Sequence, residues 1–397
     1  MLQTLSPVPP DALLGITTAF RADTSAWKVD LGVGVYRDEQ GITPIMRSVR
    51  ESERRVIANG TTKVYVGPAG NREFAAALEE LTLGADHPAR KAGRVVTLQA
   101  PGGCGALRLG AELAKFAGAT DLVVSDPTWA NHVPLLSSAG LRLGKYAYLD
   151  AATGRADANR MLDALATLPA GTLVLLQGSC HNPTGADLDR AAWHAIADLL
   201  DRRGLVPFVD IAYQGLGDGL EEDAYGVRLL AERLPEVLIA VSCSKNFGLY
   251  CERVGATLVV GQAPAQASVA MGHLQTIARR MYSMPPDHGA AIVAGIWADP
   301  QLRADWQREV AEMRTRVLEL RRGLAAALRD GHDGRFDFVA DQRGMFSLLG
   351  LPPAVVERLR TEHHVYMAPD SRVNIAGLKS ADVVPVARAI RAALAAG

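Results

Sequence analysis

One lysine stands where an apolar run ends. Lys245 directly follows VLIAVSCS (237–244), a run with the composition of a buried β-strand. Burial disfavours the charged form of an amine, so a lysine here is either a surface residue or an amine kept neutral enough to act as a nucleophile. The residues that follow the other apolar runs decide between these two interpretations.

A carboxylate lies inside another apolar run. Asp210 occurs in LVPFVDIA (205–212), and Tyr213 comes directly after that run. A carboxylate buried in a strand destabilises the fold unless a cation or a strong hydrogen-bond donor meets it. The sequence therefore predicts such a partner for Asp210.

A glycine-rich turn follows the run RVVTLQA (94–100). Gly102, Gly103 and Gly105 precede a helical pattern that we expect to begin near Ala106. Backbone N–H groups at a helix N-terminus, with no side chains in the way, bind anions. The turn lacks the third glycine of a dinucleotide-binding loop. Taken alone, it fits an anion site and a tight strand–helix connection about equally well.

Two further turns supply an aromatic ring and an amide. Trp129 lies in SDPTWANH (125–132) and can stack on a flat ligand, although core packing is the commoner use of such a ring. Asn182 precedes Pro183, so this pair marks a turn that can contain a cis peptide bond. His181 is equally well explained as a structural histidine.

Short apolar runs separated by helical patterns must position these residues. The runs are too uniformly apolar for half-exposed antiparallel strands, and they favour a parallel or mostly parallel sheet with helices on both faces. Ligands bind such sheets at the carboxyl ends of the strands, so we expect the residues that follow the runs to lie together. The five runs are RVVTLQA (94–100), DLVVSD (121–126), TLVLLQG (172–178), LVPFVDIA (205–212) and VLIAVSCS (237–244).

The two ends of the chain differ from this central pattern. Apolar residues at helical spacing from Val310 to Leu324 predict a long amphipathic helix that starts at about Glu309, and GHDGRFDF (331–338) breaks it. The first forty residues do not fit the central pattern either. We therefore predict a large α/β domain at residues 41–309 and a small domain formed by residues 1–40 and 310–397.

The overall composition is that of a globular protein. The 397-residue chain has 42 basic and 43 acidic residues and a formal charge of −1, which gives no sign of nucleic-acid binding. No apolar run approaches membrane-spanning length, and the first residues do not resemble a signal peptide. The four cysteines form no CxxC pair, which disfavours a metal site or a disulfide framework and favours reduced thiols in a cytoplasmic protein.

The chemistry of the strand-end residues converges on pyridoxal 5′-phosphate. The aldehyde of this cofactor forms a Schiff base with a lysine, its pyridinium nitrogen pairs with an aspartate, and its phosphate needs an anion site. Lys245, Asp210 and the glycine turn supply these three groups, and Trp129 can stack on the ring. We therefore predict an enzyme that uses this cofactor.

Nearly the whole chain resembles the class I aminotransferases of the aspartate and aromatic amino-acid type. The resemblance implies a fold-type I architecture, with a mostly parallel seven-stranded sheet in the large domain and a small α+β domain built from both termini. The order and spacing of the matching segments agree as well. These segments are LGVGVYRDEQGITPI, TTKVYVGPAG, PGGCGALR, SDPTWANH, CHNPTG, DIAYQGLGDGLEEDAYG, SCSKNFGLYCERVGA, RRMYSMPPDHGA, RGMFS and SRVNIAG.

The resemblance implies a role for each cofactor-site residue. Lys245 is the implied Schiff-base lysine and proton shuttle, and Asp210 is the implied partner of the pyridinium nitrogen. Tyr213 and Asn182 are expected to bind the ring hydroxyl oxygen, while Trp129 stacks on the ring and borders the substrate. The residues implied at the phosphate are Gly103, Cys104, Ser242 and Arg253, together with Tyr65 of the partner subunit.

The resemblance also implies substrate contacts that are shared between the subunits of a homodimer. Arg372 is expected to clamp the α-carboxylate as a bidentate fork, assisted by Asn182 and by the backbone at Gly34. Arg279 of the partner subunit is expected to meet the side-chain carboxylate of a dicarboxylic substrate, with support from Ser283 of the same subunit. The neighbouring Arg280 competes for this assignment, and the spacing to Tyr282 favours Arg279.

Four positions depart from the family pattern. Cys104 replaces a hydroxyl residue, and a thiol is a weak donor, so one phosphate hydrogen bond is weakened by up to ~1–2 kcal/mol. Gln177 stands where a histidine often joins the network of the ring-binding aspartate. Val64 and Met284 replace positions that are often polar in aspartate-selective members, which favours aromatic substrates.

These features predict ping-pong transamination between an L-amino acid and a 2-oxo acid. We expect dual specificity, for aspartate or glutamate and for phenylalanine, tyrosine or tryptophan, with Arg279 retaining the dicarboxylates. An elimination or oxidation on the same scaffold remains an alternative, as do a non-catalytic regulator and a nucleotide-dependent oxidoreductase built on the glycine turn. The oxidoreductase alternative leaves Lys245, Asp210 and Arg372 unexplained.

Overall fold

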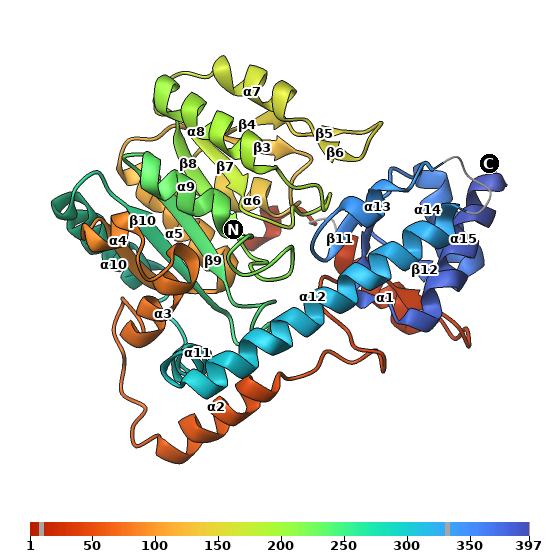
Figure 1. Cartoon of the computed structure of the whole chain (residues 1–397), viewed down its shortest axis with the longest axis horizontal. Coiled ribbons are helices and arrows are strands. Elements are labelled where there is room, and N and C mark those ends of the chain that lie inside the picture. Colours follow the sequence, from red (N-terminus) through yellow and green to blue (C-terminus); the bar gives the residue numbers. More distant parts are fainter. Residues whose placement is uncertain (8–11, 330–333, 397) are drawn as a thin grey trace.

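The computed structural model describes residues 1–7, 12–329 and 334–396, which form two lobes of unequal size (Figure 1). The larger lobe contains a seven-stranded sheet with the strand order β2-β10-β9-β8-β7-β3-β4. β10 runs antiparallel to its two neighbours, and the other paired strands are parallel, so the predicted mostly parallel sheet is confirmed. The strands are β2 (Val95–Pro101), β3 (Asp121–Asp126), β4 (Arg142–Ala147), β7 (Leu173–Gln177), β8 (Val206–Ile211), β9 (Val237–Ser242) and β10 (Val254–Val260).

Alternate residues of the sheet pack into two different cores. Phe208 and Leu238 point into the core beside α5 and α10, whereas Val209 and Ile239 point into the core beside α8 and α9. Because both faces are covered, the strands carry no polar face and form continuous apolar runs in the sequence. This explains why the runs, and not an alternating pattern, identified the sheet.

Helices cover both faces of the sheet (Figure 1). Asn71 and Asp189 cap α3 and α8 by accepting a bond from the backbone N–H three residues onward, and Gly204 ends α8 in the left-handed conformation. The helices of the larger lobe are α2 (Arg47–Asn59), α3 (Arg72–Leu83), α4 (Pro88–Lys91), α5 (Gly102–Phe116), α6 (His132–Ser137), α7 (Ala158–Ala166), α8 (Arg190–Arg203), α9 (Tyr225–Arg233), α10 (Pro264–Met281) and α11 (His288–Ala298); a short hairpin of β5 (Leu149–Asp150) and β6 (Arg155–Ala156) lies beside them.

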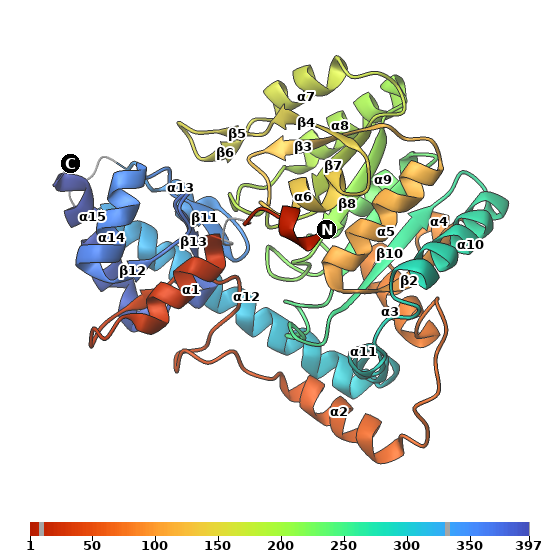
Figure 2. The ribbon, with the colours of Figure 1, turned by 180° about the vertical axis from the view of Figure 1, so that it is seen from behind.

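Elements from both ends of the chain lie together in the smaller lobe (Figure 2). β1 pairs in parallel with β12, and β11 pairs antiparallel with β13. The elements here are α1 (Ala12–Ala22), β1 (Val29–Asp30), α13 (Phe338–Asp341), β11 (Phe346–Leu348), α14 (Pro353–His363), β12 (Val365–Tyr366), β13 (Arg372–Asn374) and α15 (Val383–Ala395), with the 3₁₀ turns η2 (Ile375–Gly377) and η3 (Ser380–Asp382). The 3₁₀ turn η1 (Leu2–Thr4) lies apart from them, beside the larger lobe in both views (Figures 1 and 2).

One long helix joins the two lobes. α12 (Pro300–Arg329) begins beside α2 and α11 in the larger lobe and ends among α13 and α15 in the smaller one (Figures 1 and 2). Near its start, the indole Nε1 of Trp306 donates to the backbone oxygen of Asn246 at 2.8 Å, and the ring stacks on Phe247. The helix therefore contacts the residue next to Lys245 as well as the smaller lobe.

Two helix starts differ from the sequence prediction. α12 begins at Pro300, not at about Glu309, because the apolar spacing continues upstream through Leu302 and Trp306. α5 begins at Gly102, not near Ala106. Glycine disfavours helix interiors, but the first turn of a helix leaves its N–H groups free whatever residues form it, so glycines are tolerated there. The predicted break at 331–338 falls partly outside the described residues.

The helices are either too short or too polar to span a bilayer. Within residues 1–7, 12–329 and 334–396, no helix is both long and apolar enough to cross a membrane. The four cysteines are all free thiols, and Cys251 is exposed.

Candidate active site

A cavity of about 210 Å³ lies at the carboxyl ends of the parallel strands. It is bounded by the tips of β7, β8 and β9, by the start of α5, and by Phe346 and Arg372 of the smaller lobe. Chain segments that are far apart in the sequence therefore meet at one place. The sequence-predicted residues that line the cavity are Gly34, Gly103, Cys104, Trp129, Asn182, Asp210, Tyr213, Ser242, Lys245, Arg253 and Arg372.

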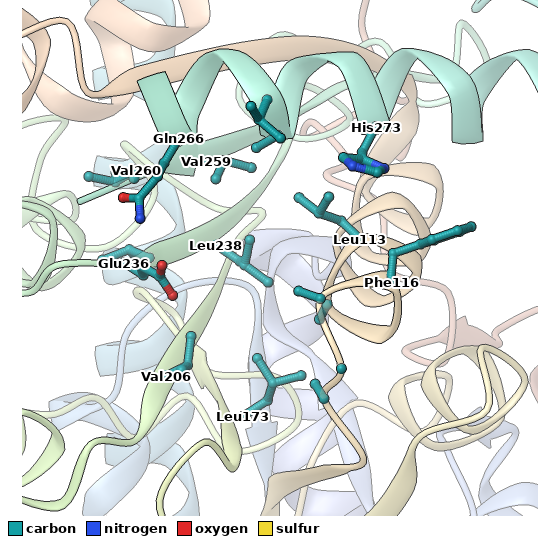
Figure 3. Close-up of a pocket in the computed structure, with 18 of the residues that line it drawn as sticks. Leu113, Phe116, Leu173, Val206, Glu236, Leu238, Val259, Val260, Gln266 and His273 are labelled. Atoms are coloured by element: carbon teal, nitrogen blue, oxygen red, sulfur yellow. The ribbon is translucent and has the colours of Figure 1, made fainter. Parts of the chain in front are cut away.

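A larger cavity of about 520 Å³ lies at the opposite ends of the same strands (Figure 3). Its walls are mainly apolar side chains of α5, α10 and the strand ends, such as Leu113, Phe116 and Leu238. Glu236 and His273 are its titratable residues, and it contains no lysine or arginine among the described residues that line it. The smaller cavity is therefore the candidate active site.

Lys245 lies in the turn after β9, half-buried, with its amine facing the cavity. Its Nζ atom is 4.8 Å from the centre of the Tyr213 ring. Burial lowers the pKa of the amine, and the positive charges of Arg253 and Arg372 lower it further, while the charge of Asp210 acts in the opposite direction. The amine can therefore lose its proton more easily than a solvent-exposed lysine, as a nucleophile or proton shuttle requires.

Asp210 has a strong hydrogen-bond partner that the sequence did not identify. The carboxylate lies 3.0 Å from Nε2 of His132, which is fully buried and whose Nδ1 lies 2.8 Å from the Thr128 hydroxyl. Trp129 packs edge-on against His132, at 5.2 Å between ring centres. His132 stands in the segment SDPTWANH, but no spacing rule connects it with a residue 78 positions away.

Two hydrogen bonds with the side chain of Gln177 fix the backbone of Asn182. The amide of Gln177 both donates to and accepts from the backbone of Asn182, at 2.9 Å in each direction, and among the described contacts it makes no bond to Asp210. The Asn182 side chain in turn donates to the Tyr213 hydroxyl at 3.4 Å. Burial raises the pKa of Tyr213, and the charge of Asp210 adds to this effect. Gln177 thus orients Asn182, although the family pattern places a partner of the aspartate at this position.

The start of α5 forms a cradle for an anion. A Cβ added at Gly102 would collide with the Arg253 guanidinium, and one added at Gly103 would come within 3.2 Å of Ser242. Arg253 bonds the Ser244 hydroxyl at 3.4 Å and the Tyr250 backbone at 3.0 Å. Free N–H groups, hydroxyls and a guanidinium therefore converge on one place, as phosphate binding requires.

Arg372 projects into the cavity from β13. Its guanidinium donates to the Gly32 carbonyl at 2.9 Å and to the Asn182 side-chain oxygen at 3.3 Å, and it lies over the Phe346 ring at 4.5 Å. Among the described residues, its buried Nε has no hydrogen-bond partner. A buried guanidinium with an unused donor is suited to bind a carboxylate group of a ligand.

Uncommon backbone conformations cluster around these residues. Positive φ angles occur at Arg253 (53°), at Cys180 (54°), two residues before Asn182, and at Ser371 (66°), directly before Arg372. Such conformations cost energy in residues other than glycine and persist where surrounding structure enforces them, often at functional sites. The Asn182–Pro183 bond is cis.

Three predicted residues lie outside the cavity. Tyr65 is 85% exposed, and both Arg279 and Ser283 are exposed near the end of α10. Arg279 donates to the Ser283 hydroxyl at 2.7 Å, whereas Arg280 lies over the Phe116 ring. A single chain therefore does not bring these residues to its own cavity. It does distinguish Arg279 from Arg280, the two candidates for contact with the side-chain carboxylate of a substrate, because they have different neighbours.

Further residues differ from the sequence analysis or were missing from it. Val64 is exposed and Met284 half-buried, and neither lines the cavity. Ser244 and Phe346 line it and were not predicted individually. His181 is buried between Ser125 and Thr184 at 2.9 Å from each, which is the structural interpretation.

Comparisons with known proteins agree with this geometry. The family model for class I and II aminotransferases matches residues 26–390. The chain is 49% identical to the aromatic-amino-acid aminotransferase of Paracoccus denitrificans, covering 98% of this chain and 99% of the relative. It is 41% identical to the aspartate aminotransferase of Escherichia coli (strain K12), covering 99% and 100%. A crystal structure of the aromatic-amino-acid aminotransferase from Burkholderia pseudomallei, covalently bound to pyridoxal phosphate, superimposes with a TM-score of 0.97 at 42% identity, covering 99% of each chain.

Proposed function

The chain belongs to the class I and II aminotransferase family, and we propose that it transfers the amino group of aspartate, glutamate or an aromatic amino acid to a 2-oxo acid. The observation that carries this proposal is the meeting of Lys245, Asp210 and Arg372 in one cavity. An amine, a ring-binding carboxylate and a carboxylate-binding guanidinium are the groups that pyridoxal-phosphate transamination needs.

The cavity fits pyridoxal phosphate. The glycine cradle leaves room where a Cβ would collide, and Asp210, the second-last residue of β8, lines the cavity wall. Bound there, the cofactor supplies an electron sink for the substrate's α-carbon. We assign the phosphate to Gly103, Cys104, Ser242 and Arg253. The ring is assigned to Asp210, Tyr213, Asn182 and Trp129, and the aldehyde to Lys245.

The protein's own side chains then have separate tasks. Lys245 Nζ would take a proton from the substrate's α-carbon and deliver it to the former aldehyde carbon of the cofactor, because burial lowers the pKa of this amine and favours its neutral form. Arg372 and Asn182 hold the α-carboxylate, with the backbone at Gly34 beside them. His132 Nε2, 3.0 Å from the Asp210 carboxylate, holds this carboxylate at the place assigned to the cofactor ring.

Dual substrate specificity follows from two opposing features. Relatives named for aromatic substrates and for aspartate are similar to this chain over its whole length, so identity alone does not choose between them. From the partner subunit, Arg279 would offer a guanidinium for a second carboxylate, whereas Val64 and Met284 would offer apolar contacts for an aromatic ring. We propose that both substrate classes react.

The exposed residues support a homodimer with shared active sites. Val64 and Tyr65 are 75% and 85% exposed, and Ile57 at the end of α2 is 69% exposed. Exposed apolar side chains that lie next to one another, as at Val64, Tyr65 and Val66, are typical of an interaction site. We propose that Tyr65, Arg279 and Ser283 of each chain complete the cavity of the other.

The two lobes support a division into two domains, which we propose at residues 41–309 and at residues 1–40 with 310–397. The free thiols support a reducing, cytoplasmic location.

Spectroscopy and kinetics test this proposal. The protein loaded with pyridoxal phosphate should show an imine absorbance that each amino-acid substrate bleaches, and 2-oxoglutarate should restore it. Comparable kcat/KM values for aspartate and phenylalanine are expected. A 2-oxo acid product without return of the amine to 2-oxoglutarate would instead identify elimination or oxidation.

A further inference from the structure

Arg321 is a fully buried charge that lies outside the cavity. It projects from the last third of α12, is 0% exposed, and makes no ion pair within the described part of the chain. Burial lowers the pKa of its guanidinium to about 9. A buried charge without a direct ion pair is costly, so its hydrogen bonds must offset the loss of water, with a favourable contribution from the charge of Asp187.

Those hydrogen bonds converge on one short stretch of the smaller lobe. Arg321 donates to the Gly344 carbonyl at 2.7 Å, to the Phe346 carbonyl at 2.5 Å and to the Ser347 hydroxyl at 2.8 Å. It also donates to the carbonyls of Arg343 and Val339. The backbone of residues 343–347, here called the clasp segment, is therefore folded around a single guanidinium.

The clasp segment carries the wall of the carboxylate-binding site. Phe346 lines the cavity, and its ring contacts both the Arg372 guanidinium at 4.5 Å and Tyr213 at 6.1 Å. Phe346 also begins β11, whose pairing with β13 places Leu348 opposite Arg372. Any shift of the clasp segment must therefore shift the strand from which Arg372 projects.

The same segment is joined to the turn that carries Asn182. The backbone N–H of Arg343 donates to the Gly185 carbonyl at 2.8 Å, and a Cβ added at Gly185 would meet the clasp carbonyls. On the opposite side of that turn, Asp187 accepts from the N–H groups of Cys180 and His181 at 2.7 and 2.9 Å. Both partners of the Arg372–Asn182 contact are thus fixed relative to the clasp segment.

We propose that Arg321 is a positioning residue for the carboxylate clamp formed by Arg372 and Asn182. This inference rests on the proposed function, because it assigns the α-carboxylate of the substrate to that clamp. Arg321 touches neither substrate nor cofactor. It acts by fixing the clasp segment, and through it the distance between the two groups that grip the carboxylate.

Two substitutions and a matched control test the proposal in the cofactor-loaded enzyme. Arg321→Met removes the donors but keeps the stem, and Arg321→Lys keeps the charge with fewer donors in a different geometry. The control is Arg94→Met, because Arg94 also donates to backbone carbonyls, those of Gly261 and Leu234 at 2.7 and 2.9 Å, at the other end of the sheet. Thermal unfolding of each variant reports the loss of stability separately.

The decisive readout compares phenylalanine with phenethylamine, which has the same side chain and no carboxylate. We expect Arg321→Met to lower the ratio of their single-turnover kcat/KM values by about 10- to 100-fold, mostly through KM for phenylalanine. Arg321→Lys should lower it less, and Arg94→Met should leave it unchanged. The pH titration of the cofactor's absorbance should stay as in the unsubstituted enzyme.

A ratio unchanged in Arg321→Met overturns the proposal, and so does equal loss for both substrates. Should Arg321→Met fail to fold, an unchanged ratio in Arg321→Lys overturns it equally. Failure of the proposed function has a different signature. In that case the unsubstituted enzyme does not react with phenylalanine, or Arg372→Ala leaves the ratio unchanged.

Discussion

The residues assigned to the active site form two groups that differ in their surroundings within one chain. The strand-tip group, which includes Lys245, Asp210 and Asn182, lies in the cavity, and its members are largely buried and joined to neighbours by hydrogen bonds and ring contacts. The surface group of Tyr65, Arg279 and Ser283 is exposed and lies outside the cavity. In the proposed homodimer, one subunit therefore supplies the reacting groups, while residues of both subunits determine which substrate side chain is accepted.

The difference has a physical basis. Proton transfer and ring binding need groups fixed to within fractions of an ångström, and sheet tips in a packed core provide this rigidity. Recognition of a substrate side chain tolerates looser geometry and can be supplied across an interface. Substitutions in the two groups should therefore differ in the size of their effect and in the range of substrates that they affect.

Substitution of Lys245 should abolish the reaction. Lys245→Ala removes the proposed covalent attachment point and proton shuttle, so kcat should fall by at least ~10⁴-fold. Steady-state rates and the loss of the imine absorbance measure this. The fold should persist, because the side chain is half-buried and makes no ion pair in the described chain. Residual activity within tenfold of the unsubstituted enzyme would remove Lys245 from the strand-tip group.

Substitution of Arg372 should weaken every substrate alike. Two charge-assisted bonds to the α-carboxylate are worth about 3–4 kcal/mol together, so Arg372→Ala should lower kcat/KM by about 100- to 1,000-fold for aspartate and phenylalanine. The ratio between the two substrates should change little. A loss confined to one substrate would show that Arg372 contacts the side chain of the substrate and not its α-carboxylate.

Substitution of Arg279 should act on one substrate class only. Arg279→Ala should lower kcat/KM for aspartate by about 10- to 100-fold and leave phenylalanine within about threefold. Steady-state kinetics with both substrates measure the change. Arg280→Ala is the matched control, since Arg280 lies over Phe116 instead.

Mixed dimers show whether the two groups come from different subunits. When Lys245→Ala and Arg279→Ala chains are combined, one cavity of each mixed dimer receives Lys245 from one chain and Arg279 from the other. Aspartate activity should therefore exceed that of either variant alone. Absence of any recovery in a verified mixed dimer would place Arg279 in the cavity of its own chain.

The stability of the protein should depend on pH through His181, the structural histidine next to Asn182 of the strand-tip group. Burial lowers the pKa of His181 to about 3, so between pH 6.5 and 3 the unfolded chain binds a proton that the folded chain does not. The contribution of His181 to the free energy of unfolding has its full value above pH 6.5. Below pH 6.5 this contribution falls by about 1.4 kcal/mol for each pH unit. Denaturant unfolding of His181→Gln should show a shallower loss between pH 6.5 and 4.5. Parallel slopes would contradict this assignment.

The smallest effect is expected at the phosphate cradle. Cys104→Ser supplies a stronger hydrogen-bond donor, so cofactor affinity should increase by about 3- to 10-fold. Fluorescence titration of the cofactor-free protein measures this change. Cys251→Ser is the control, because Cys251 is exposed and does not line the cavity.

The strand-tip group could be predicted because its members lie near the end of a recognisable apolar run or in the turn that follows it. Lys245 and Asp210 are polar residues at the ends of strands, and parallel strands bring their ends together. His132 and Arg321 could not be predicted in the same way, since each acts through a contact between segments far apart in the sequence. The sequence predicts a start of α5 near Ala106 instead of Gly102, because glycine destabilises helix interiors. In the first turn of a helix, however, glycine is tolerated.

The long helix α12 also fixes the distance between two of its contacts. Trp306 bonds the backbone of Asn246, next to Lys245, while Arg321 holds the clasp segment below Arg372. The roughly fifteen residues between them span about 22 Å, and one inserted residue would add about 1.5 Å and turn Arg321 by roughly 100°. The number of helical turns between Trp306 and Arg321 thus sets the spacing between Lys245 and the proposed carboxylate clamp. Insertions and deletions among relatives should gather in loops and avoid the interval from Trp306 to Arg321.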